Sequence, residues 1–290
     1  MAGTHRSGQA VRVSTAPTPA ELVTRVSQVF DTVADDYDQS GVAFFAPIAD
    51  RLVELLDPRP GERVVDVGCG RGAVTLPLAR AVGEDGSVTA LDVSPAMVAH
   101  TKAAARAAGL DRVSVELGDA TSLRLPERSF DVLASSLVLF FLPRPAESLP
   151  GWLRLLRPGG RAGVTTFGKQ DDTWRAVDAL FVPYLPPALV DPRTRGVDTP
   201  FGSDEAMAAM ATAAGAREVR TVRETLPVVF DDAAHWRAWT MGTGQRMFWR
   251  FVPEDQREGI FEQAAALLEE ARDGDRIVLH QDVRHTLAVV

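Results

Sequence analysis

The stretch that decides the fold is "VVDVGCGRGAV", which runs from Val64 to Val74. Its first valines form a short, β-branched apolar run, a pattern typical of a strand that is buried on both faces. Glycines then cluster from Gly68 onward, and apolar residues recur at helical spacing over residues 73–79. The pattern predicts a strand, a glycine turn and a helix. A turn without Cβ atoms lets a ligand approach the backbone, and we expect free N–H groups at the helix start to meet its polar groups.

Composition narrows the class of protein. At 290 residues, 46% of them apolar, the chain is long enough for one large domain or two small ones with a packed core. A net charge of −8 without a concentrated basic stripe argues against nucleic acid as a partner, because phosphate binding needs clustered Lys and Arg. No segment has the ~20 apolar residues of a membrane span, and the N-terminus lacks a secretory pattern. We therefore expect a cytoplasmic protein that does not bind membranes.

The number of cysteines limits the disulfides and metal sites that the chain can form. Cys69 is the single cysteine, which excludes an internal disulfide and argues against a zinc cluster, so we expect no metal. Its place between two turn glycines provides no neighbouring base. We therefore interpret Cys69 as a small residue that fits the turn and not as a nucleophile.

Strand and helix patterns alternate along most of the chain. This alternation predicts a Rossmann-like α/β fold with a seven-stranded, mostly parallel, doubly wound sheet, whose ligands bind beyond the carboxyl ends of the strands. The strands are expected at 63–67, 87–91, 112–117, 130–135, 161–167, about 218–228 and 276–290. The helices are expected at 21–30, 44–56, 73–81, 95–108, about 146–156, about 205–214, 233–251 and 254–271.

Domain boundaries follow from shifts in composition. Residues 1–18 are mostly small, polar or Pro and are expected to form a disordered tail. Residues 19–57 are expected to form an N-terminal helical cap, and residues 58–290 the α/β domain. The segment after residue 168 is rich in Pro, Gly and charge, which indicates an excursion above the sheet. We expect residues 168–215 and 232–252 to form a lid over the substrate.

The glycine turn alone leaves the ligand open. The dinucleotide fingerprint G-x-G-x-x-G requires glycine three places after Gly70, where this chain has Ala73, a residue that the fingerprint tolerates. Asp92 ends the second strand 24 residues after Gly68, the first glycine of the turn, where a carboxylate can accept hydrogen bonds from ribose hydroxyls. The alternative for Asp92 is a helix cap, although Ser94 and Pro95 already supply the N-cap and first helical position. Both NAD and S-adenosylmethionine carry such a ribose.

Several motifs in order now indicate a family. The chain resembles the class I S-adenosylmethionine-dependent methyltransferases through "VVDVGCGRG", "VTALDVSPAMV", "LGDATSLRLPERSFDVL" and "LRPGGRAGV", which match that family's first to fifth motifs. It is most similar to the ubiquinone and menaquinone biosynthesis methyltransferases and to small-molecule methyltransferases of bacterial natural-product pathways, including antibiotic biosynthesis. Tyr37-Asp38 matches a "YD" pair of their N-terminal helices. The resemblance covers at least residues 30–167.

The resemblance implies roles for one set of residues around the cofactor, S-adenosylmethionine. The backbone of Gly68, Cys69 and Gly70 would lie against its methionine part, and Asp66 would help to place its amino group. Asp92 would bind the ribose.

A second set would surround the adenine and the methyl group. The resemblance implies that Val93 and Met97 pack against the adenine, and that Asp119 with the Ala120 amide recognises the adenine edge. A carboxylate accepts from the exocyclic amine while an N–H donates to a ring nitrogen, which agrees with this role, although Asp119 could instead cap a turn.

The methyl group should lie near the end of the fourth strand. There the resemblance places Ser135 and Ser136, with Tyr37 closing over the same pocket. Alignment of a nucleophile and exclusion of water are the main tasks of the protein, because the sulfonium methyl group is already electrophilic. An alcohol or carbon acceptor needs a base, and His235 is the best placed histidine, the alternative being a solvated helix residue.

The acceptor is expected to be an apolar or aromatic small molecule, natural-product or quinone-like, that is methylated on oxygen or carbon. Aromatic residues gather in the segments expected around it, although core packing is an alternative for each: Phe44, Phe45, Phe140, Phe141, Trp174, Phe181, Tyr184, Trp236, Trp239, Phe248 and Trp249. Two other functions stay open, an NAD-dependent oxidoreductase and a cofactor-binding protein that catalyses a non-methylating reaction. The sequence also leaves open a homo-oligomer.

Overall fold

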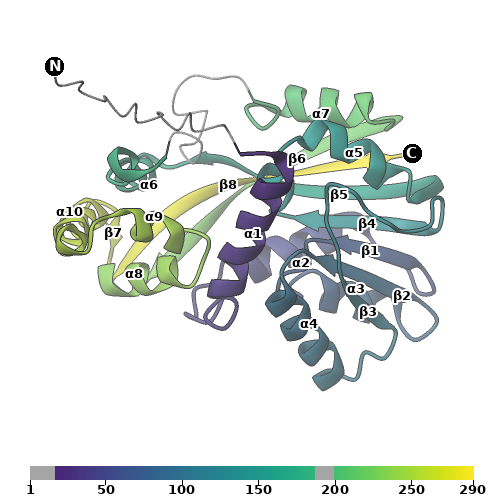
Figure 1. Ribbon diagram of the computed structural model, residues 1–290, viewed down its shortest axis with the longest axis horizontal. Coiled ribbons are helices and arrows are strands. Elements are labelled where there is room, and N and C mark those ends of the chain that lie inside the picture. The colour runs from purple at the N-terminus through teal and green to yellow at the C-terminus, as the bar shows by residue number, and fades with distance from the viewer. Residues whose placement is uncertain (1–16, 187–198) are drawn as a thin grey trace, which may run out of the picture.

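The computed structural model describes residues 17–186 and 199–290, so nearly all of the predicted disordered tail and residues 187–198 of the predicted lid lie outside the described residues (Figure 1). The strands are β1 (Arg63–Val67), β2 (Ser87–Asp92), β3 (Val113–Leu117), β4 (Phe130–Ser136), β5 (Leu156–Gln170), β6 (Glu218–Phe230), β7 (Arg272–Asp273) and β8 (Arg276–Val289). The α-helices are α1 (Pro19–Val33), α2 (Phe45–Leu56), α3 (Thr75–Val82), α4 (Pro95–Ala107), α5 (Pro145–Leu153), α6 (Asp172–Ala179), α7 (Asp204–Ala213), α8 (Ala233–Met241), α9 (Arg246–Phe251) and α10 (Arg257–Glu269).

One twisted sheet organises the chain. Seven strands run in the order β3-β2-β1-β4-β5-β8-β6, and the two-residue strand β7 pairs only with β8. The first five strands of this order are parallel, while β8 is antiparallel to both β5 and β6. The predicted seven-stranded, mostly parallel sheet is therefore confirmed, with β7 as a short addition.

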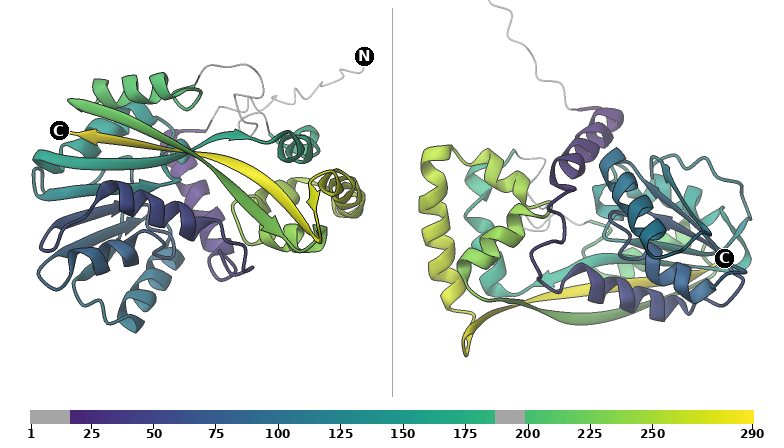
Figure 2. Two further views of the ribbon diagram at one scale, coloured as in Figure 1. Left: turned by 180° about the vertical axis from the view of Figure 1, so that it is seen from behind. Right: turned by 90° about the horizontal axis from the view of Figure 1, so that it is seen from below.

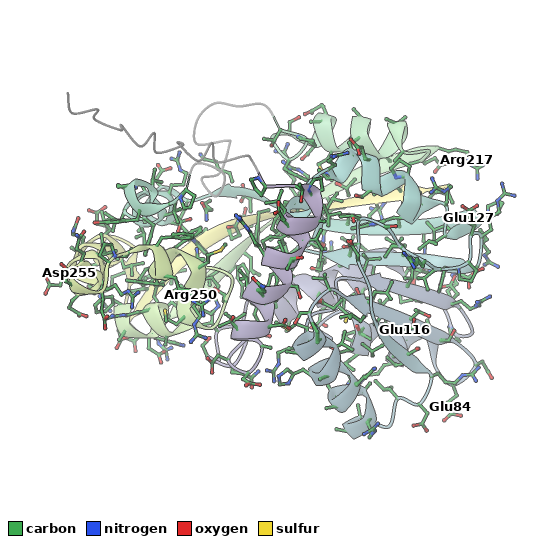
Figure 3. All side chains as sticks on the ribbon, viewed as in Figure 1. Glu84, Glu116, Glu127, Arg217, Arg250 and Asp255 are labelled. Carbon is green, nitrogen blue, oxygen red and sulfur yellow. The ribbon has the colours of Figure 1, made fainter. Side chains whose placement is uncertain are left out.

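The central strands are apolar because both of their faces are covered. Val64 of β1 pairs in register with Val88 of β2 and Val132 of β4, and all three side chains are buried. Helices α2, α3 and α4 cover one face, and α5 and α7 cover the other (Figure 2). Gly163 of β5 lets α2 pack closely, since a Cβ there would lie 2.8 Å from a methyl carbon of Leu52. Charged side chains such as Glu84, Glu116 and Arg217 lie on the outer rim (Figure 3).

Some boundaries differ from the prediction. Strand β5 begins at Leu156, so the "RPGG" stretch expected as a turn lies within the strand, where an irregularity in the β4–β5 register accommodates it. Within the inserted helical lid that was expected here, the sequence located no individual helix between residues 168 and 201, where helix α6 and a short 3-10 helix at Val182–Tyr184 form.

A helical lobe lies beyond the carboxyl end of β5. We use this term for α6, α8, α9 and α10, which pack on the extended ends of β5, β6 and β8 around a shared apolar core (Figure 1). Helix α7 does not belong to it, because its buried methionines pack with α5 on the main sheet. The lid boundaries 168–215 and 232–252 therefore include α7, which covers the sheet, and leave out α10, which packs against α6 and α8.

An ion pair between the part-exposed Asp204 and the buried Arg284 fixes the start of α7. Asp204 accepts hydrogen bonds from Arg284, which is 5% exposed, and from the more exposed Arg223, both at 2.5 Å. Arg284 also donates to the Phe201 carbonyl oxygen at 3.0 Å, so the pair ties the chain before α7 to β8.

Removal of the Asp204 carboxylate would leave the Arg284 guanidinium buried without a counter-charge. We predict that Asp204→Ala lowers the free energy of unfolding by about 3 kcal/mol in urea denaturation. The matched control is Asp172→Ala, which removes an exposed partner of Arg175 and should leave stability unchanged. Equal stability of the two variants would contradict this account.

Candidate functional site

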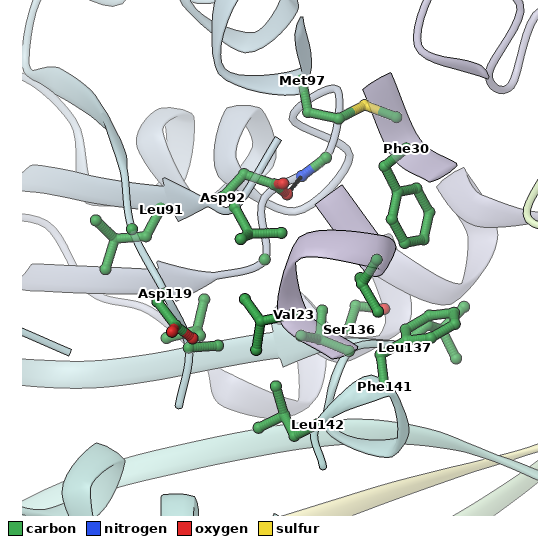
Figure 4. Close-up of a pocket in the computed structure, with 18 of the residues that line it drawn as sticks. Val23, Phe30, Leu91, Asp92, Met97, Asp119, Ser136, Leu137, Phe141 and Leu142 are labelled. Carbon is green, nitrogen blue, oxygen red and sulfur yellow. Dashed lines mark hydrogen bonds between the residues drawn. The ribbon is translucent and has the colours of Figure 1, made fainter. Parts of the chain in front are cut away.

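A pocket opens at the carboxyl ends of the parallel strands, beneath α1 (Figure 4). Asp92 and Asp119 lie on one side of it, and Phe30, Leu137 and Phe141 on the other. The strand ends and loops supply most of the lining: Val67, Gly68, Gly70, Leu91, Asp92, Val93, Met97, Gly118, Asp119, Ala120, Ser136, Leu137, Val138, Phe141 and Leu142. The helix α1 and the segment after it supply the rest: Val23, Val26, Phe30, Tyr37 and Phe45.

The glycine turn after β1 is fixed to the end of β2. Gly68 and Gly70 have φ angles of 79° and 53°, in the left-handed region that favours glycine. The N–H groups of Gly68 and Cys69 both donate to the Leu91 carbonyl oxygen, at 2.8 and 2.9 Å. The Gly70 N–H donates to Asp92 Oδ2 at 2.8 Å. The backbone of the turn is therefore held by the neighbouring strand.

These hydrogen bonds show what the backbone of the turn, as distinct from the helix start, can offer a ligand. The N–H groups of Gly68, Cys69 and Gly70 already have partners inside the protein. What the turn offers is space, since a Cβ on Gly70 would meet no heavy atom within 4 Å. Gly68 is required for close packing, because a Cβ there would lie 2.3 Å from a methyl carbon of Val138.

Asp92 organises the side of the pocket next to the turn. Its carboxylate is 9% exposed and also accepts from the Ser94 N–H at 2.9 Å. Ser94 in turn caps α4 by accepting from the Met97 N–H, as expected, so Asp92 is not the N-cap residue. Burial raises the pKa of Asp92, and the backbone N–H groups that donate to it oppose the rise.

Asp66 carries an unsatisfied oxygen. The Thr75 hydroxyl donates to Asp66 Oδ2 at 2.6 Å, while Oδ1 is buried without a hydrogen-bond partner. Burial raises the pKa of Asp66 to about 7, the Thr75 hydrogen bond opposes this, and the charge of Asp92 adds to it. A buried carboxylate oxygen without a partner suits a cationic group of a ligand.

The loop after β3 contributes Asp119 and Ala120 to the lining. Asp119 Oδ1 accepts from both the N–H and the hydroxyl of Thr121 at 2.8 Å, so the residue does cap a turn, the alternative that the sequence left open. The Ala120 carbonyl oxygen accepts from Trp152 Nε1 at 2.7 Å, which fixes the loop on α5.

Tyr37 lies between aromatic rings at the apolar side of the pocket. Its ring centroid is 6.0 Å from that of Phe30 and 4.8 Å from that of Phe45. Burial raises the pKa of Tyr37 far above its usual value, so the phenol stays neutral. Val93, Met97 and Ser136 also line the pocket, as expected.

Three predicted cofactor residues are absent from the pocket lining: Asp66, which is buried beneath it, Cys69 and Ser135. The Ser135 hydroxyl donates to the Val67 carbonyl oxygen at 2.8 Å and is fully buried between β4 and β1, because successive side chains of a strand alternate between faces. Cys69 is buried and does not line the pocket with its side chain. Burial raises the pKa of the Cys69 thiol well above its usual value, which agrees with a packing role and not with a nucleophile.

His235 does not reach the pocket. Its Nδ1 accepts from the Asp231 N–H at 3.1 Å, and Nε2 lies 3.0 Å from the Ser40 carbonyl oxygen. With Nδ1 accepting, Nε2 carries the proton and donates to Ser40. Both ring nitrogens thus have partners within the protein: Nδ1 bonds locally at the start of α8, and Nε2 joins α8 to the segment before α2. His235 is also absent from the pocket lining, which argues against the predicted catalytic base.

Sequence reasoning missed the part of α1 that covers the pocket. Val23, Val26 and Phe30 lie on one face of the helix, and the Phe30 ring packs edge-on against Phe141 at 5.3 Å. Their helical spacing could have indicated an apolar face but not what it covers. Of the aromatic residues expected around the acceptor, Phe45 and Phe141 line the pocket. Six others are buried in the core of the helical lobe: Phe44, Trp174, Phe181, Trp236, Trp239 and Trp249.

Fold and site together define a class of protein. A doubly wound sheet with a glycine turn after β1 and a carboxylate at the end of β2 is the arrangement of Rossmann-like proteins that bind a nucleoside-containing cofactor. Within residues 17–186 and 199–290, no group of side chains suited to a metal ion occurs, and no helix is long and apolar enough to cross a membrane.

Comparison with known proteins identifies the family. Residues 64–160 match a family described as "Methyltransferase domain". The chain is 39% identical over 242 residues to nocamycin O-methyltransferase of Saccharothrix syringae, covering 80% of this chain and 86% of the relative. It is 37% identical over 167 residues to aklanonic acid methyltransferase DauC of Streptomyces sp. strain C5, covering 58% and 76%. The fold resembles that of the [4+2]-cyclase SpnF, with a TM-score of 0.51, 21% identity, and 93% and 97% coverage.

The chain belongs to the family of S-adenosylmethionine-dependent methyltransferases. The predicted family, fold class and cofactor are thereby confirmed. Membership also decides against the NAD-dependent oxidoreductase that the glycine turn had left open.

The raised pKa of Asp66 predicts a pH dependence of stability. Ionisation of this buried carboxyl is costly, so the unfolding free energy of the ligand-free protein should fall as the pH rises from about 4, the pKa of an unfolded Asp, to about 7. In Asp66→Asn this contribution is absent. Between pH 4.5 and 8, wild type should lose on the order of 3 kcal/mol relative to the variant in urea denaturation. Parallel pH profiles would contradict the assignment.

The two hydrogen bonds of His235 predict a structural effect. We expect His235→Ala to lower the free energy of unfolding by about 1 to 2 kcal/mol, because it leaves the Ser40 carbonyl and the Asp231 N–H without these partners. Affinity for S-adenosylhomocysteine in calorimetric titration should be unchanged. If His235→Ala binds S-adenosylhomocysteine more weakly while its free energy of unfolding is unchanged, His235 would have a role in the binding site after all.

Proposed function

We propose that the chain transfers the methyl group of S-adenosylmethionine to an acidic oxygen of an apolar small molecule, a natural product of the antibiotic type. The observation that carries this proposal is the polarity of one pocket. Carboxylates gather at its polar side, whereas its other side is aromatic and aliphatic. The relatives' names, an O-methyltransferase and a methyltransferase of an acid, support the same chemistry.

The order of strands in the sheet determines how we orient the cofactor along the pocket. Asp119 and Ala120 follow β3, Asp92 ends β2, Gly68 and Gly70 follow β1, and Ser136 ends β4, and these strands are successive neighbours in the sheet. We assign the adenine to the β3 end, the ribose to β2, the methionine part to β1 and the methyl group to β4. The apolar side, with Leu137 and Phe141, then receives the acceptor.

The residues present suit each part of the cofactor. Asp92 would accept from the ribose hydroxyls, and Asp119 from the adenine amine, with the Ala120 N–H as donor. The orphaned Asp66 Oδ1 would face the amino group, while the open space at Gly70 admits the methionine chain. Val93 and Met97 would pack on the adenine faces, and Tyr37 and Ser136 would adjoin the methyl group.

The transfer itself requires alignment more than proton removal. When bound, the cofactor supplies a sulfonium methyl carbon, at which a new O–C bond forms as the C–S electron pair returns to sulfur. No His, Lys or Arg is among the described residues that line the pocket, and the Tyr37 phenol stays neutral. An acceptor that is already ionised, such as a carboxylate or an acidic phenol, needs no base. Phe30, Phe45 and Phe141 would exclude water and orient it.

The helical lobe would complete the acceptor site. Phe45 lines the pocket and touches Phe44, whose ring lies in the apolar core of the lobe. We therefore assign the substrate wall to the lobe, with α1 as the cap over the cofactor.

Calorimetric titration with S-adenosylmethionine, S-adenosylhomocysteine and NAD tests the cofactor assignment. We predict tight binding of the two adenosyl-sulfur ligands and a loss of about 100-fold in Asp92→Ala, since hydrogen bonds to a charged acceptor contribute about 1.5–3 kcal/mol each. The control is Ser135→Ala, which alters a buried bond outside the pocket and should keep the wild-type affinity.

Three other outcomes would count against the proposal. Binding of NAD alone would contradict the assignment of the cofactor. Equal affinities of the Asp92 and Ser135 variants would contradict the role of Asp92. Binding of the cofactor without methyl transfer to any carboxylic acid or phenol would favour the non-methylating alternative.

A further inference from the structure

The helical lobe contains a concentration of unsatisfied buried polar atoms. Four of the seven such side-chain atoms in the described part of the chain lie there: Nε1 of Trp174, Trp236 and Trp239, and Oε1 of Gln245. Leaving a buried donor or acceptor unpaired is costly, so native folds keep such groups for a reason, such as a ligand that pairs with them. Trp249 of the same lobe shows the ordinary solution, because its Nε1 donates to the Thr240 hydroxyl at 3.0 Å.

Two of these indoles do not line the pocket but are connected to Phe45 of its lining through a chain of ring contacts. Trp174 and Trp239 touch each other, with centroids 5.8 Å apart, and both touch Phe44, at 6.4 and 5.3 Å. Phe44 lies 5.0 Å from Phe45, which lines the pocket beside Tyr37. Trp174 and Trp239 are 2% and 3% exposed.

Gln245 adds an unpaired acceptor on the side of α6 that carries Trp174. It lies at the N-cap of α9, and its Nε2 donates to Asp178 Oδ1 at 3.3 Å. Asp178 lies one turn after Trp174 on α6, which brings the Gln245 amide to the same side of that helix. The hydrogen bond to Asp178 fixes which end of the amide is the donor, and Oε1 is the end left without a partner.

We propose that Trp174 Nε1, Trp239 Nε1 and Gln245 Oε1 form the polar end of the acceptor site and recognise a hydroxyl group remote from the oxygen that is methylated. This inference rests on the proposed function. A hydroxyl accepts from an indole N–H and donates to Gln245 Oε1, so one group pairs with both kinds of orphaned atom. The acceptor is accordingly an apolar ring system with an acidic oxygen at one end and a hydroxyl at the other.

Trp236 provides the matched comparison. Its Nε1 is also unpaired, but its ring packs against Trp249, at 6.1 Å, and no ring contact joins it to Phe44 among the described residues. Trp236→Phe therefore removes an orphaned indole of the same lobe outside the proposed site.

Three probes separate the hydrogen bonds. They are 6-hydroxy-2-naphthoic acid, its 6-methoxy analogue, which accepts but cannot donate, and 2-naphthoic acid, which does neither. With the full-length protein saturated with S-adenosylhomocysteine, we expect calorimetry to show about tenfold tighter binding of the hydroxy acid than of 2-naphthoic acid, with the methoxy acid between them.

Four variants test which residues cause the preference for the hydroxy acid. Gln245→Met, at a half-buried position, should remove the difference between the hydroxy and methoxy acids. Trp174→Phe and Trp239→Phe should reduce the preference of both oxygenated probes over 2-naphthoic acid. Trp236→Phe should keep the wild-type ratios. Because each readout is a ratio of affinities in one protein, a general loss of stability does not imitate the effect.

The outcomes distinguish this inference from the function on which it rests. The polar end proposed here is wrong, and the cofactor assignment stands, if S-adenosylhomocysteine binds but no naphthoic acid does. The same conclusion follows if the protein shows no preference for the hydroxy acid, or if that preference persists in Gln245→Met, Trp174→Phe and Trp239→Phe. If S-adenosylhomocysteine itself fails to bind, the proposed function fails and takes this inference with it.

Discussion

The Asp92 carboxylate, buried at the end of β2, holds the site together through two backbone N–H groups. One comes from Gly70 in the turn after β1, and the other from Ser94 at the start of α4. Because β1 and β2 are parallel neighbours, this single side chain fixes the turn, the strand end and the helix start relative to one another. The raised pKa of Asp92 reflects the desolvation that this position imposes. A ligand at this point meets a carboxylate that is already oriented.

Helix α1 depends on the same arrangement. Ser94 donates to Asp31 at 2.6 Å, and Ser27 donates to the Val93 carbonyl oxygen at 3.0 Å, so α1 is anchored to the loop that Asp92 organises. Just after the carboxyl end of α1, Asp36 pairs with Arg246 of the helical lobe at 3.1 Å. The pocket thus lies beneath a helix whose contacts join the sheet to the lobe.

Local patterns predicted much of this structure and missed what depends on distant partners. The alternating strands, the glycine turn and the placement of Asp92 follow from spacing along the chain, and they predicted the sheet. Six residues of the pocket lining were supplied by the family resemblance instead: Tyr37, Val93, Met97, Asp119, Ala120 and Ser136. Ser135 and Ser136 are identical residues on opposite faces of β4. Only Ser136 faces the pocket, and the sequence does not show which of the two faces is the buried one. His235 was misjudged because its partner, the Ser40 carbonyl, lies 195 residues away in the sequence. The turn's N–H groups are occupied by the Leu91 carbonyl oxygen and the Asp92 carboxylate, two partners at the end of the neighbouring strand that no local pattern shows.

The central claim is that the space between α1 and the ends of β1, β2 and β3 holds the adenosyl cofactor. Hydrogen–deuterium exchange with and without S-adenosylhomocysteine tests it most directly, because it reports where the ligand stabilises the backbone. The account predicts slower exchange in α1, in residues 68–74 and in the loop at 118–122, with little change at the far end of α10. Protection confined to the helical lobe, or absent from α1 and the glycine turn, would contradict it.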